Sequence, residues 1–71
     1  MKIYKINILR YGNEDIGEHL FGYFSNKDEG IEEARRYNTL RGGKYPEIFV
    51  FEIPLDKEIP FEDVFPQRVY L

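Results

Sequence analysis

The stretch EIFVFEI, residues 47–53, predicts the centre of the fold. Successive side chains point to opposite sides of a strand, and here both sides are apolar. Phe49 and Phe51 would lie on one side, and Ile48 and Val50 on the other. A strand that is apolar on both sides is typical of the interior of a sheet. We therefore expect residues 47–53 to form an interior strand.

A helix is predicted before this strand, over about residues 26–41. Ser25 would start it as the N-cap, with an acid at the third helical position, a variant of the capping box. Arginines gather toward its end, where the helix dipole favours cations, and Gly42-Gly43 supply a stop. Gly30 costs about 1 kcal/mol relative to Ala inside a helix. We therefore expect another group to pack closely against Gly30.

Two strands are predicted nearer the N-terminus, over residues 2–11 and 18–24, because apolar and polar residues alternate there. A loop would join them. In the second strand, strict alternation would place Phe21 and Phe24 on opposite faces. Gly22 between them either lets a ring pack closely or marks a bulge.

The tail, residues 54–71, is interrupted by three prolines, so no long element fits there. Residues 61–65 could form one helical turn, because a proline precedes them. Residues 67–71 could form a short last strand, since an apolar terminus is expected to dock.

These elements predict a small two-layer α+β domain. Its sheet would have three to four mainly antiparallel strands, with one helix packed on one face, in the order β-β-α-β and a possible fourth strand. We expect a single domain over residues 1–71, with its core in residues 2–54 and a proline-interrupted arm over 55–71.

The composition excludes several classes of site. The chain has 71 residues, no Cys and one His. Disulfides, zinc-thiolate sites and cysteine nucleophiles are therefore ruled out, and a serine triad would have only Ser25 and His19 to draw on. We expect no enzymatic activity, no cofactor and no small-molecule substrate. The lack of Cys fits a reducing compartment, and neither a signal peptide nor a membrane span is recognisable, so we expect a cytoplasmic protein that does not bind membranes.

Two acidic segments are candidates for chemistry, residues 14–18 together with His19, and residues 56–63. Oxygen-rich clusters suit divalent cations, but the first segment matches no known ligand loop. Paired carboxylates can hydrolyse glycosides only across a cleft of fixed width, which a chain of 71 residues is poorly able to build. We interpret both segments as solvated acidic loops and expect no metal.

The basic stretch 34–45 is the best candidate for binding an anion, because it carries four cations and two tyrosines without an acid. Cations follow phosphates, and aromatic rings stack on bases. A helix end also recruits cations for its own stability, and the net charge of −3 opposes binding to polyanions. The candidate binding residues are Arg35, Arg36, Arg41, Lys44 and Tyr45.

Several short motifs follow one another along the chain: Gly22-Tyr23-Phe24-Ser25, Lys27-Asp28-Glu29, Ala34 within the helix, Tyr45-Pro46, and Phe49-Val50-Phe51-Glu52-Ile53 ending near Leu55-Asp56. Over about residues 3–57 the pattern resembles a family of small bacterial and phage β-β-α-β proteins of unknown function. The resemblance implies a bacterial or phage accessory protein. It implies no activity, cofactor or catalytic residue, and the longer tail of this chain departs from the family pattern.

We expect a small non-catalytic interaction or regulatory module that binds a protein partner or itself. Surplus apolar surface on a small chain is often covered by a partner, and two sheet edges joined across a two-fold axis, giving a homodimer, are the simplest arrangement. The alternative is binding of nucleic acid or another anion through residues 35–45.

Overall fold

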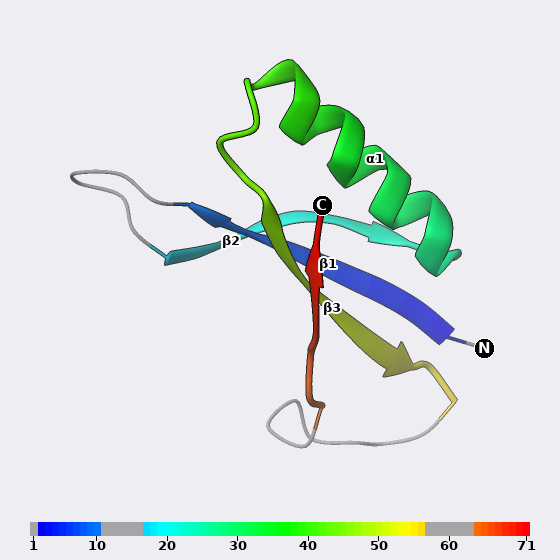
Figure 1. Ribbon diagram of the computed structural model, residues 1–71. Helices are drawn as coiled ribbons and strands as arrows, with labels where there is room; N and C mark the ends of the chain where they lie inside the picture. Colours follow the sequence, from blue (N-terminus) through cyan, green and yellow to red (C-terminus); the bar gives the residue numbers. More distant parts are fainter. Residues whose placement is uncertain (1, 11–16, 57–63) are drawn as a thin grey trace.

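The computed structural model describes residues 2–10, 17–56 and 64–71. They form a small α+β domain with the element order β-β-α-β-β (Figure 1). This confirms the predicted fold class, and the fourth strand, which the sequence left open, is present. The elements are β1 (Lys2–Arg10), β2 (Gly17–Phe24), α1 (Lys27–Leu40), β3 (Glu47–Pro54) and β4 (Gln67–Tyr70).

The described strands form one antiparallel sheet in the order β2-β1-β3-β4. The β3 strand lies inside the sheet, as its apolar faces predict. Val50 pairs with Ile6 of β1, and Ile48 pairs with Val69 of β4. The β2 and β4 strands form the two edges.

The two faces of the sheet have different environments. The helix face packs against α1, where Ile6, Ile8, Ile48 and Val50 meet Ala34 of the helix in the buried core. Because side chains alternate along a strand, the neighbouring positions of β1 and β3 point the other way, and none of the described elements lies over them (Figure 1). We call this second side the open face; its residues are Ile3, Lys5, Asn7, Leu9, Glu18, Leu20, Tyr23, Glu47, Phe49, Phe51, Ile53, Arg68 and Tyr70.

The helix begins one residue later than predicted. Asn26, rather than Ser25, is the N-cap, and its side-chain oxygen accepts a hydrogen bond from the backbone N–H of Glu29 at 3.1 Å. Both residue types can cap a helix. The prediction was wrong because sequence alone does not show which of the two adjacent residues takes the extended cap conformation, which Asn26 has with φ −125° and ψ 124°.

The helix ends at the predicted glycines. Gly42 and Gly43 have φ of 73° and 75°, which glycine adopts without the steric cost that other residues carry. The N–H of Gly43 donates to the carbonyl of Asn38 at 2.8 Å, and that of Gly42 to Thr39 at 3.1 Å. This pair of bonds is the Schellman motif, which satisfies carbonyls at the helix end.

Gly30 lies where α1 crosses the sheet, as its cost inside the helix predicts. A β-carbon at this position would come 2.6 Å from Cδ1 of Ile6 and 2.9 Å from the Phe24 ring. The missing side chain therefore lets the helix approach the sheet closely.

The β2 strand contains a bulge at Phe21. Gly22 pairs with Ile6 and Leu20 with Asn7, so Phe21 is an extra residue between them. The prediction that Phe21 and Phe24 lie on opposite faces was wrong, because the bulge interrupts the alternation. Both rings lie on the helix face, with centroids 6.0 Å apart. Both readings of Gly22 are confirmed, because it adjoins the bulge and a β-carbon there would lie 3.2 Å from the Phe24 ring.

The helical turn predicted over 61–65 and the loop joining the first two strands lie mostly outside the described residues. In the described part of the chain, no helix is long and apolar enough to cross a membrane.

Candidate functional site

The first two predicted anion-binding residues are paired with acids of the same helix. Arg35 forms an ion pair with Glu32, and Arg36 pairs with Glu33 at 3.3 Å, each three residues apart and exposed. These acids lie just before the basic stretch, and the helix brings them beside the arginines. The pairing neutralises half of the four predicted cations.

The remaining predicted residues lie near the end of the helix. The Arg41 guanidinium lies 5.2 Å from the ring centroid of Tyr37, and Tyr37 stacks on Tyr45 with centroids 5.7 Å apart. Arg10 of β1 lies 5.8 Å from the Tyr45 ring. Lys44 is exposed nearby in the sequence. The structure thus brings Arg10, which the sequence analysis did not single out, to Tyr45 and separates Arg35 and Arg36 into ion pairs of their own.

Tyr45 has a structural role in addition. Its ring continues a row of aromatic contacts across the helix face, because Phe21 contacts Tyr37 at 5.4 Å between centroids. Its backbone N–H donates to the side-chain oxygen of Asn38 at 2.7 Å. A change at Tyr45 would therefore disturb packing as well as any bound anion.

The open face of the sheet carries three exposed large hydrophobic residues, while Leu40, Leu55 and Phe65 are exposed outside the strands. Leu20, Tyr23 and Tyr70 are 55%, 54% and 68% exposed, and Phe49 and Phe51 between them are partly buried. Leu20 and Tyr23 lie at the β2 edge, and Tyr70 lies at the β4 edge. A strip of mixed chemistry therefore extends across the four described strands, with apolar side chains on β2, β3 and β4 and with Lys5 and Asn7 of β1 between them.

Two cationic side chains lie across the phenylalanines of this strip. The Lys5 ammonium is 5.2 Å from the Phe51 centroid, and the Arg68 guanidinium is 5.4 Å from the Phe49 centroid. Such contacts are attractive because the ring face is electron-rich. Arg68 also pairs with Glu47, whose side chain is only 8% exposed. The faces of both phenylalanine rings are thus already in contact with cations.

A buried amide lies in the middle of the open face. Asn7 is 9% exposed, and its Nδ2 donates to Oε2 of Glu18 at 3.1 Å. Its Oδ1 is buried without a hydrogen-bond partner in the described structure. A buried acceptor of this kind costs about 1–3 kcal/mol, so the position lowers the stability of the sheet.

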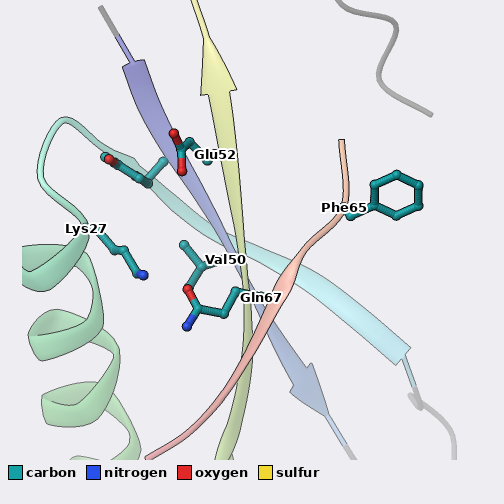
Figure 2. Close-up of a pocket in the computed structure, with 6 residues that line it drawn as sticks. Lys27, Val50, Glu52, Phe65 and Gln67 are labelled. Carbon is teal, nitrogen blue, oxygen red and sulfur yellow. The ribbon is translucent and has the colours of Figure 1, made fainter. Parts of the chain in front are cut away.

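A small pocket lies on the helix face between the start of α1 and β4. Figure 2 shows Lys27 extending from the helix toward Val50 and Gln67. The pocket holds about 90 Å³, well below the roughly 300 Å³ at which small-molecule sites begin. It suits a few water molecules better than an organic ligand. Its lining residues are Tyr4, Lys27, Val50, Glu52, Phe65 and Gln67.

The acidic candidates are only partly described. Glu18 and His19 lie on β2, and Asp56 follows β3, while the other carboxylates of the two segments lie outside the described residues. Among the residues that the structure describes, no group of three or more histidine or carboxylate side chains could hold a metal ion. The described geometry therefore provides no basis for proposing a metal centre.

Comparisons with protein-family models, with curated proteins and with solved structures find no match for the chain. The resemblance to small bacterial and phage β-β-α-β proteins therefore stays a prediction. Any functional proposal must rest on the surfaces described above.

Proposed function

We propose that the chain is a small non-catalytic interaction module that binds a protein, either another chain or a second copy of itself, through the open face and the adjoining edge of β2. The observation that carries the proposal is the one-sided position of α1. The helix buries the core on one face, while Leu20, Tyr23 and Tyr70 stay more than half exposed on the other. Exposed apolar side chains gathered on one face mark protein–protein contact sites, and here Lys5 and Asn7 of β1 lie among them.

The chemistry of the open face favours a protein over a nucleic acid. Base stacking needs accessible ring faces, and Lys5 and Arg68 already lie over Phe51 and Phe49. A bound base would have to displace a cation from its ring. A protein side chain can instead pack against the aliphatic stems of Lys5 and Arg68. These stems cover the rings but are themselves apolar.

Cross-linking tests the proposal directly. A photoreactive phenylalanine analogue at Tyr70 would report contacts of the open face, and the same analogue at Glu33 would report the exposed side of α1. In the native cells we expect covalent adducts to a protein from position 70 and few from position 33. The absence of adducts at position 70, or equal adducts at both positions, would contradict the binding of another protein on the open face.

The alternative proposal is anion or nucleic-acid binding at the helix end. It is favoured by the position of Arg10 and Arg41 beside Tyr45 and Tyr37, and by the exposed Lys44. It is weakened by the acids that pair with the other two arginines. Binding of a single-stranded oligonucleotide that weakens steeply with salt, and that is lost on Arg41→Gln with Lys44→Gln, would support this alternative.

A further inference from the structure

The outer edge of β2 carries fewer than the usual devices that block strand addition. Exposed edges commonly carry lysine or proline, or are very short, and these features prevent pairing with other chains. The β4 edge is four residues long, follows Pro66 and carries Arg68. The β2 edge is eight residues long and contains no Lys, Arg or Pro. Its devices of this kind are the bulge and the charge of Glu18.

The bulge also restricts which strand can pair along this edge. Residues directly opposite one another in an antiparallel pair point to the same face, so a matching strand must repeat the irregular pattern of β2. Leu20 and Tyr23 lie on the open face three positions apart, instead of the two positions of a regular strand. Their neighbours on the helix face are His19, Phe21, Gly22 and Phe24.

A second β2 strand repeats this pattern when it runs antiparallel with Phe21 opposite Gly22. Leu20 then lies opposite Tyr23, and His19 opposite Phe24, so that every pair shares a face. Sliding the second strand by one or two positions in either direction places an open-face residue opposite a helix-face residue. The bulge therefore makes β2 complementary to itself in one register.

We propose that a second copy of this chain pairs along β2 in this register, about a two-fold axis perpendicular to the sheet. The inference rests on the proposed function, because it identifies a second copy as one partner of the module. The two four-stranded sheets would become continuous, with both helices on the same side. Their open faces would join into one surface.

The register covers the apolar residues that the monomer exposes. Leu20 and Tyr23 are 55% and 54% exposed. Leu20 of each copy would contact Tyr23 of the other copy, so that four side chains form a cluster at the axis. Aromatic–aliphatic pairs of this kind stabilise antiparallel strands. Glu18 would lie opposite Ser25 of the second copy, so that no like charges face each other.

Open-face packing of two copies is a weaker arrangement. Glu18 and Glu47 lie at one end of the open face, and Ile3 and Ile53 lie at the other. If two open faces packed on one another as aligned sheets about a two-fold axis, each carboxylate would lie against the same carboxylate of the other copy or against an isoleucine. Either contact would bury the exposed Glu18 carboxylate against another carboxylate or an apolar side chain, whereas edge pairing along β2 leaves it opposite Ser25.

Sedimentation of the purified full-length chain tests the inference. We expect a dimer, and we expect Tyr23→Lys to weaken dimerisation at least tenfold, because it replaces an apolar contact at the axis with a cation. Tyr70→Lys is the matched control: Tyr70 is an exposed tyrosine on the same face at the opposite edge, and its replacement should leave the dimer unchanged. Circular dichroism would show that both variants fold.

Cysteine pairing tests the register, because the natural chain has no Cys. A mixture of Leu20→Cys and Tyr23→Cys chains should form disulfide-linked dimers faster than either variant alone. A monomeric natural chain at its solubility limit, equal rates in the cysteine experiment, or a dimer disrupted by Tyr70→Lys would each overturn the inference. In those cases cross-links from position 70 to another protein would still support the proposed function, because Tyr70 lies at the β4 edge, away from the β2 pairing.

Discussion

Asn38 and Tyr45 are joined by a hydrogen bond in which the Tyr45 backbone N–H donates to the Asn38 side-chain oxygen at 2.7 Å. Asn38 lies in the last turns of α1 and is 9% exposed. The bond fixes the direction in which the chain leaves the helix and enters β3. It therefore ties the helix to the interior strand that organises the sheet.

Asn38→Ala should lower the free energy of unfolding by about 1 kcal/mol, because it leaves a partly buried N–H without its acceptor. Urea unfolding followed by circular dichroism would measure the loss. Thr39→Ala is the control, since Thr39 is the exposed neighbour in the same helix and surface changes usually stay within about 0.5 kcal/mol. Equal losses in the two variants would show that the Asn38 bond adds nothing.

Gly30→Ala should also destabilise the protein, although alanine is the better helix former by about 1 kcal/mol. The added β-carbon would lie 2.6 Å from Ile6 and 2.9 Å from the Phe24 ring, and overpacking of a core costs about 1–3 kcal/mol. The melting temperature of the variant should fall below that of the natural chain. A variant that melts higher would mean that the helix shifts to accept the methyl group at little cost.

Arg68→Met should lower stability by about 1–3 kcal/mol, because it removes the guanidinium that pairs with the buried carboxylate of Glu47. The double change Arg68→Met with Glu47→Gln should recover part of the loss, since it removes the buried charge. A double-mutant cycle from urea unfolding gives the coupling between the two side chains. If the stability losses of the two single variants simply add in the double variant, the two side chains are not coupled.

The ion pair between Lys2 and Glu52 should make a small, pH-dependent contribution. The hydrogen bond and the charge of Glu52 raise the pKa of Lys2 above its usual 10.5. A raised pKa means that the folded state holds the proton more tightly, so the stabilisation is complete below pH 10.5 and is lost as the pH rises through the folded-state pKa. Both groups are exposed, so added salt should weaken the effect.

Unfolding of the natural chain and of Lys2→Met, compared from neutral pH upward, measures this contribution. The difference between them should be small at neutral pH and should close at strongly alkaline pH. A difference that widens as the pH rises would have the wrong sign and would exclude the ion pair as its cause.

The elements could be predicted from sequence because they depend on local patterns. Alternation over residues 47–53 predicted the interior strand, and Gly42 and Gly43 predicted the end of the helix. Gly30 predicted a close approach that the structure confirms. Each inference used the periodicity or the backbone freedom of a few neighbouring residues.

The candidate surfaces could be predicted only in part. The basic stretch was recognisable, but the arginine–glutamate pairs depend on which side chains one helical turn brings together. The contact of Arg10 with Tyr45 joins residues far apart in the sequence. The faces of β2 were misassigned because a bulge depends on how a strand pairs with its neighbour.

By itself, the sequence determined the fold class, the order of the elements and the exclusion of cysteine chemistry, since these follow from composition and short-range periodicity. Only the tertiary structure decided which face of the sheet α1 covers, and therefore which apolar side chains remain exposed. That outcome depends on long-range packing, in which Gly30 admits the helix beside Ile6 and Phe24 and the bulge turns Phe21 into the core. The same bulge leaves Leu20 and Tyr23 on the open face, where the proposed contacts lie.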